Sequence, residues 1–214
     1  KNYGYKTWGD MFNSRQKLFI ITTIQKIRNA HNKMLQEKLS EDKIKFIISS
    51  LCVILDRVIN FDSVLCTLNT VGGRGVTQTF SRQTLPIVWD YMESNPFNSL
   101  AAGWISSVEK SRKWLENISK ITNNLITVQN CSATSLPYSD EYFDAVFTDP
   151  PYYDNIPYSY LSDFFYVWLK RMAKDVFPEL FSTLLTPKTD EIVLYTYDKS
   201  YDEAKIQFET MLSK

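Results

Sequence analysis

The chain has 214 residues, of which 44% are hydrophobic and 22% charged, and its 24 basic and 24 acidic side chains cancel. This composition is typical of a soluble globular protein, and it excludes a strongly basic or acidic chain without excluding a local basic groove. Cys52, Cys66 and Cys131 lie far apart and His31 is the only histidine, so we expect neither a zinc site nor a disulfide framework, and we expect a reducing, cytoplasmic compartment. No apolar run reaches the roughly 18 residues that a membrane span needs, so we expect no membrane partner.

The first half of the chain has the periodicity of helices. Asn13 or Ser14 can cap a helix that continues to Gln36, and with Asn13 as the cap Gln16 completes a capping box. Ser40 can start a second helix. Its apolar residues form one stripe at helical spacing, which we expect in the core: Ile44, Ile47, Ile48, Leu51, Leu55, Val58 and Ile59.

The helical pattern stops at Asn60 and returns further along the chain. Residues 60–84 are predicted to be a loop, because glycines cluster at positions 72, 73 and 75. Pro86 suits the first turn of a short helix with the sequence PIVWDYME. A further helix is predicted over residues 104–118. Residues 1–120 should therefore form a mainly helical region.

The second half has a mixed pattern. Residues 125–128 are a short run with β-strand preference, and residues 143–148, FDAVFT, form a compact apolar run of the kind found in a buried parallel strand. Helices are predicted over residues 160–174 and 201–212. An α/β region over residues 121–214 should follow the helical region.

Asp149, Pro150, Pro151 and Tyr152 follow directly after the predicted strand, and ligands of open α/β sheets bind at the carboxyl ends of strands. An exocyclic amine of a nucleobase is a poor nucleophile because its lone pair is delocalised into the ring. The carboxylate of Asp149 and the carbonyl of Pro150 can each accept one of its N–H groups and stabilise the positive charge that develops on the nitrogen. The prolines stiffen the loop, Tyr152 offers a face for an extruded base, and no metal is needed. Alternatively, the four residues are a proline turn that only ends a strand.

The segment FDAVFTDPPY resembles the catalytic motif of amino-methyltransferases that modify adenine or cytosine. Longer stretches resemble one branch, the adenine-specific DNA methylases whose longer members carry a zinc-ribbon insertion. These stretches are YGYKTWGDMFNSRQ, TFSRQTLPIVWDYMESNPF and TDPPYYDNIPYSYLSDFFYVWLKR. The resemblance implies a Rossmann-like sheet that binds S-adenosylmethionine, here partial and preceded by the helical region. It also implies that Asp149, Pro150, Pro151 and Tyr152 are the catalytic residues.

The chain departs from this family where the cofactor binds. The glycine-rich loop and the acidic residue that hold S-adenosylmethionine have no counterpart, since the cluster at Gly72, Gly73 and Gly75 does not match that loop. Cys131, Ser132 and Ala133 stand where the family has an acidic residue followed by alanine near the cofactor's adenine, so the resemblance implies a cofactor contact at Ser132 and Ala133. The chain thus resembles an internal or split fragment, whose cofactor-binding segment belongs to the same or a companion chain.

Further candidates lie around the catalytic loop. Tyr153, Asp154 and Asn155 continue it and are expected to bind substrate, or else form an ordinary polar loop. Arg82 is a candidate for a phosphate contact, as are Arg74 and Lys188, although solvated surface charge is the commoner role.

The expected function is S-adenosylmethionine-dependent methylation of the exocyclic amine of adenine in DNA, as part of a larger or split enzyme. Two alternatives stay open at this point. One keeps the chemistry and changes the substrate to RNA or to a guanine amine, and the other is a non-catalytic fragment that binds nucleic acid or a partner protein.

Overall fold

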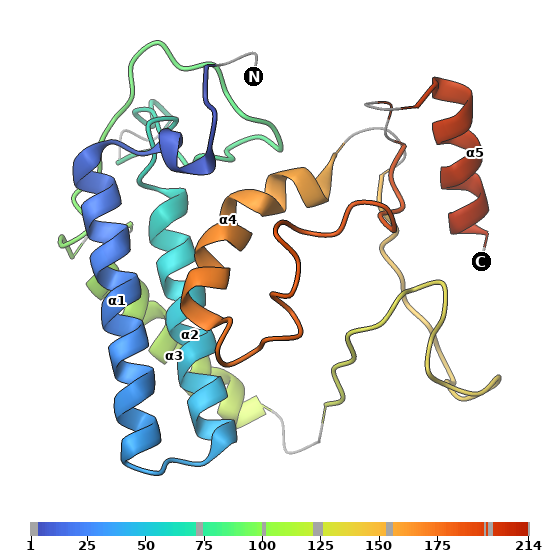
Figure 1. Cartoon of the computed structure of the whole chain (residues 1–214), viewed down its shortest axis with the longest axis horizontal. Helices are drawn as coiled ribbons and strands as arrows, with labels where there is room; N and C mark the ends of the chain where they lie inside the picture. Colours follow the sequence, from blue (N-terminus) through green and yellow to red (C-terminus); the bar gives the residue numbers. More distant parts are fainter. Residues whose placement is uncertain are drawn as a thin grey trace. The chain divides into compact units, whose positions relative to one another are not determined.

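The computed structural model describes residues 4–71, 75–99, 102–121, 126–152, 156–194, 196 and 199–213. Within these ranges the regular structure is helical (Figure 1): a 3-10 helix and five α-helices, namely η1 (Trp8–Met11), α1 (Ser14–Gln36), α2 (Glu41–Asn60), α3 (Trp104–Ile121), α4 (Tyr158–Ala173) and α5 (Tyr201–Leu212). The chain divides into two compact units. The first unit comprises Lys1–Thr122 with Leu161–Thr186, and the second comprises Asn123–Tyr160 with Pro187–Lys214.

The capping box predicted at the start of α1 is confirmed. The backbone N–H of Gln16 donates to Asn13 Oδ1 at 3.0 Å, and the backbone N–H of Asn13 donates to Gln16 Oε1 at 2.8 Å. Two amide groups that lack a partner inside the helix are thereby satisfied. The box fixes where α1 begins.

The end of α1 is a Schellman motif. Lys38 has a positive φ of 55°, the N–H of Leu39 donates to the carbonyl of Met34 and the N–H of Lys38 donates to that of Leu35. This motif reverses the chain within a few residues, so α2 returns alongside α1 and packs against it.

The core of the first unit lies where α1, α2 and the Leu161–Ala173 part of α4 meet. The apolar stripe predicted for α2 is confirmed, since its residues are buried or packed against the core. Phe164 of α4 is fully buried, and its ring contacts those of Phe12 and Phe80 at 5.6 and 5.0 Å between centroids. The helix α3 also packs against α2. The helices predicted over 104–118, 160–174 and 201–212 are confirmed within a few residues at each end.

The helix predicted for PIVWDYME is wrong. Residues 85–95 have no regular secondary structure, and Ile87 and Trp89 are exposed instead of forming a buried helical face. Contacts with other parts of the unit hold this segment: the N–H of Met92 donates to the carbonyl of Cys66, and Glu93 accepts from Asn13. These contacts outweigh the weak local preference for a helix.

The predicted α/β fold class, with a partial Rossmann-like sheet, is also wrong. The described part of the chain contains helices and a single isolated bridge between Leu68 and Val76, but no strand or sheet. Residues 126–128 and 143–148 are irregular and exposed, with Val146 and Phe147 at 69% and 95% exposure. A strand needs neighbours for its N–H and C=O groups. The apolar run is present in the sequence, but no described segment pairs with it.

In the second unit, hydrogen bonds join the start of α4 to residues that follow it by about 30 positions. The hydroxyl and the backbone N–H of Ser159 both donate to the Glu191 carboxylate, the latter at 2.8 Å. Ser200 caps α5 in a second capping box with Glu203. Ala204 and Phe208 are the buried residues of α5. Among the helices described in either unit, none has the length and apolar character needed to cross a bilayer.

Candidate functional site

The four residues of the predicted catalytic loop lie in an extended, irregular segment of the second unit, and three of them are exposed. Pro151 is half-buried, whereas the Tyr152 ring is 55% exposed. Within the described ranges no hydrogen bond or ion pair engages the carboxylate of Asp149. Both the carboxylate and the ring are therefore available to a ligand.

An aromatic cluster precedes this segment. Tyr138, Tyr142 and Phe143 contact one another, with centroids 4.7 to 4.9 Å apart. Phe147, just before the loop, is outside this cluster and almost fully exposed. The segment thus presents apolar surface as well as the polar groups of the loop.

Ser132 and Ala133, the expected cofactor contacts, form part of a small turn. Ser132 Oγ lies 2.9 Å from Thr134 Oγ1, and the N–H of Ser135 donates to the carbonyl of Ser132. Both predicted residues are exposed. An exposed turn does not enclose a molecule of the size of S-adenosylmethionine, because ligand sites bury most of the ligand surface.

The remaining predicted contacts belong to different parts of the chain. Tyr153, Asp154 and Asn155 lie outside the described residues, as does Arg74. Arg82 is an exposed side chain of the first unit. Lys188 lies in the second unit with its ammonium 4.9 Å from the centroid of the Tyr160 ring.

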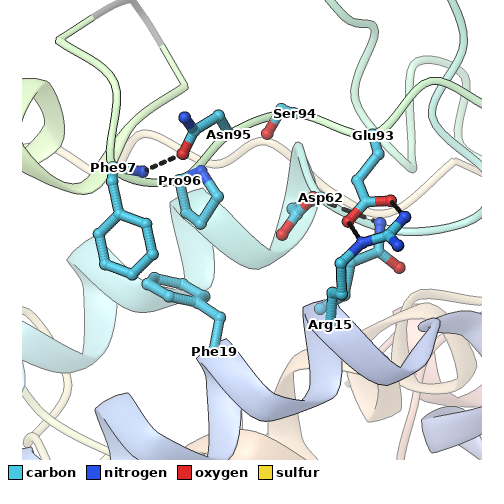
Figure 2. A pocket seen from close by; sticks show the side chains of 9 residues that line it. Arg15, Phe19, Asp62, Glu93, Ser94, Asn95, Pro96 and Phe97 are labelled. Carbon is cyan, nitrogen blue, oxygen red and sulfur yellow. Dashed lines mark hydrogen bonds and ion pairs between the residues drawn. The ribbon is translucent and has the colours of Figure 1, made fainter.

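The sequence interpretation missed a cavity of about 360 Å³ in the first unit, which charged and aromatic side chains line together. Figure 2 shows Arg15 and Phe19 projecting from α1 toward the loop of residues 93–97, with Asp62 beside them. The Phe19 and Phe97 rings meet edge to face at 5.5 Å and form an apolar wall. Asp62 is only 2% exposed, and its Oδ1 accepts from Gln16 Nε2 at 3.3 Å.

The charges of this cavity are divided between an ion pair and a lone carboxyl group. Arg15 donates to Glu93 at 2.6 and 3.0 Å, and these bonds lower the pKa of the Glu93 carboxyl. Burial raises the pKa of Asp62 to about 6, although hydrogen bonds from Gln16 and the Ser94 backbone act in the opposite direction. Ser94 Oγ is buried without a hydrogen-bond partner in the described ranges. Asp62 can therefore exchange a proton near neutral pH.

Little in the sequence marks this cavity. An aspartate two residues after a helix is usually solvated. The residues that line the cavity are separated by up to about 80 positions in the sequence, as the 78-residue separation of Arg15 and Glu93 illustrates. The capping box at Asn13 and Gln16 was the one local signal, because Gln16 belongs to both arrangements.

Comparison with known proteins gives no match: no family model, curated protein or solved structure matches this chain. Its relation to the adenine-specific DNA methylases thus stays a resemblance of motifs.

Proposed function

We propose that this chain supplies the catalytic loop of an S-adenosylmethionine-dependent methyltransferase that acts on the exocyclic amine of adenine in DNA, as part of a larger or split enzyme. The observation that carries the proposal is the loop Asp149–Tyr152, whose carboxylate and ring are both accessible. The cofactor supplies the methyl group, and a further segment of the same or a companion chain is needed to bind it.

The residues of the loop would act on the amine. The Asp149 carboxylate accepts one N–H of the adenine amine and stabilises the positive charge that develops on nitrogen during transfer. Pro150 and Pro151 have a fixed φ, so the acceptor groups are placed with little loss of chain entropy. The ring of Tyr152 stacks on the extruded base, a contact worth roughly 1–3 kcal/mol.

The exposed apolar side chains before the loop support the fragment interpretation. Val146 and Phe147 are largely exposed, and a soluble chain gains stability by covering such groups. A cofactor-binding segment that packs on residues 143–148 would cover them and lie next to Asp149.

The test is methyl transfer by the complete enzyme, meaning this chain together with the segment that binds the cofactor. Asp149→Ala should lower the rate by at least about 10²–10³-fold, the usual loss for one preorganised charge-stabilising group. DNA affinity should change little, because phosphate contacts provide most of it. Tyr152→Phe should retain much of the activity, since stacking needs the ring. The readout is incorporation of labelled methyl groups into adenine-containing DNA.

A matched control is Asp140→Ala, which removes another exposed carboxylate of the same irregular segment, outside residues 143–148, and should leave the rate unchanged. Full activity of Asp149→Ala would refute the role of this residue. Parallel reactions with RNA and with guanine-containing DNA that lacks adenine identify the substrate. Transfer to RNA alone would keep the chemistry and overturn the choice of DNA.

A further inference from the structure

A second cavity of the first unit, of about 1240 Å³, carries an unusual concentration of positive charge. Five basic side chains line it, from the segment before η1, from α1 and from the end of α4: Lys6, Arg28, Lys170, Arg171 and Lys174. The lining contains no acidic side chain. The cavity is larger than the roughly 300–1,000 Å³ of a usual small-molecule site, which favours an extended ligand.

Several of these cations keep their charge available. The ammonium of Lys170 and the guanidinium of Arg171 donate to neutral backbone carbonyls, those of Thr183 and Val167. In the described part of the chain, the Lys6 and Lys174 ammonium groups have no hydrogen-bond or ion-pair partner. Lys6, Lys174 and Arg171 are exposed. A ligand with several negative charges can therefore meet at least four cations that no carboxylate neutralises.

Two carboxylates that neighbour lining residues in the sequence already have hydrogen-bond partners. Asp175 accepts from Arg28 at 2.7 Å, which makes Arg28 the weakest of the five as an anion contact. The Asp10 carboxylate accepts the backbone N–H groups of Lys6 and Thr7 at 2.9 and 2.8 Å. Neither acid lines the cavity, so the local balance stays positive.

Aromatic and apolar side chains share the cavity with the cations. Tyr5 and Trp8 are half-buried, and Met11, Ile24 and Trp168 add buried apolar side chains to the lining. Rings beside a row of cations are the combination that binds unpaired bases and their phosphates. In a duplex the bases are paired and stacked inside, so they cannot stack on these rings. A duplex should therefore bind this cavity less tightly than a single strand does.

We propose that this cavity binds a single-stranded segment of nucleic acid, with its phosphates on Lys6, Lys170, Arg171 and Lys174 and its bases against Tyr5 and Trp8. This goes beyond the proposed methyl transfer, because it assigns a binding site in the first unit that uses neither Asp149 nor the cofactor. If the methyl-transfer experiment fails, the proposal of strand binding still stands. If the strand-binding experiment fails, the proposal of methyl transfer still stands.

The experiment measures fluorescence anisotropy of a short, labelled, mixed-sequence single strand of DNA with the full chain. The double variant Lys6→Gln with Lys174→Gln should weaken binding at least tenfold. It should also reduce the slope of log affinity against log salt by about 1.4, roughly 0.7 for each lost phosphate contact on a single strand. Both lysines are exposed, and a circular dichroism spectrum equal to that of the wild type checks that the helices are kept.

The control is Lys26→Gln with Lys43→Gln, which removes the same charge from exposed positions of α1 and α2 outside the cavity lining. Its affinity should stay within about twofold of the wild type. Equal losses in the two double variants would overturn the site, as would the absence of any binding. The same-sequence duplex, a single-stranded RNA and vesicles of anionic phospholipid are run alongside. Tighter binding of the duplex or of the vesicles than of the single strand would overturn the proposal, whereas the RNA arm shows which sugar is preferred.

Discussion

At the scale of single residues, two carboxyl groups, that of half-buried Asp56 and that of buried Asp62, are expected to dominate the response of stability to pH. Burial raises the pKa of Asp56 to about 8, and Asp56 Oδ1 has no hydrogen-bond partner among the described residues. The pKa of Asp62 is raised to about 6. The folded state therefore holds protons that the unfolded state has already released, and stability falls as pH rises from about 4 through the folded pKa values.

The first prediction is that Asp56→Asn removes part of this pH dependence. In the wild type, the free energy of unfolding should fall by up to about 1.4 kcal/mol per pH unit between pH 5 and 7 from Asp56 alone. The neutral amide of the variant does not ionise, so the free energy of unfolding of the variant should rise steadily relative to that of the wild type as the pH increases over that range. Urea denaturation at several pH values measures the slope. Asp90→Asn, at an exposed loop position, should keep the wild-type slope, and an unchanged slope in Asp56→Asn would contradict the assignment.

Asp56 also affects its neighbour on α2. Burial, with a smaller contribution from the Asp56 charge, raises the pKa of the Cys52 thiol to about 12. A thiol of this kind stays protonated at neutral pH and is a poor nucleophile. Cys52 is therefore a core residue of α2, in keeping with its burial beside Ile48 and Leu55.

At the scale of the element, the turn between α1 and α2 offers a test of backbone strain. Lys38 has a φ of 55°, where a β-carbon is disfavoured and glycine is not. Lys38→Gly should stabilise the protein by about 0.5–1 kcal/mol despite the greater freedom of glycine in the unfolded chain. The shift in the urea midpoint measures this gain. Lys38→Ala removes the same charge but keeps the β-carbon, so an equal gain in both variants would show that charge and not φ is responsible.

The elements differ in how well the sequence predicts them. The boundaries of α1 and α5 follow from side-chain chemistry within a few residues, as at Asn13 and Gln16, and they were predicted closely. The strand predicted at residues 143–148 is absent from the structure. A strand forms only where another segment pairs with it, and the apolar pattern of FDAVFT does not reveal whether such a segment exists. The PIVWDYME helix failed since contacts distant in sequence, such as Met92 to Cys66, decide that segment.

The candidate sites show the same division. Asp149–Tyr152 is a contiguous motif, so the sequence alone identifies it as a candidate. The cavities depend on residues brought together by folding: Asp62 meets Gln16, and Lys6 and Lys174 come to line one cavity. Net charge hides the second cavity completely, because acidic residues elsewhere cancel its cations.

At the scale of the whole molecule, the chain passes from its first unit into the second, returns to the first at Leu161 and enters the second again at Pro187. The first unit has a buried core in which Phe164 from α4 belongs to one apolar cluster with Ile20, Ile48 and other residues of α1 and α2. In the second unit, residues 126–152 are irregular and largely exposed. Exposed irregular backbone opens at low cost in free energy, whereas the helices of the core open only with much of the unit.

Limited proteolysis should reveal this difference. Chymotrypsin should cut first after Tyr142, Phe143 or Phe147, because these exposed aromatic residues lie in irregular backbone. Cleavage within α1 or α2 should come much later. Mass spectrometry of the first fragments identifies the cuts, and early cleavage after Phe19 or Phe46 would contradict the assignment of the stable core. If a cofactor-binding segment covers residues 143–148, its addition should slow the first cuts.

The exposed segment before the proposed catalytic loop also bears on self-association. Short apolar segments such as FDAVFT, with little charge, are the kind that stack between copies of a chain into cross-β fibrils when nothing covers them. Pro150 and Pro151 follow directly, and since proline has no N–H to donate, the stacking ladder cannot continue past Asp149. The two prolines that would position the acceptors for methyl transfer thus also act as gatekeepers, confining any fibril-forming stretch to the residues that precede them.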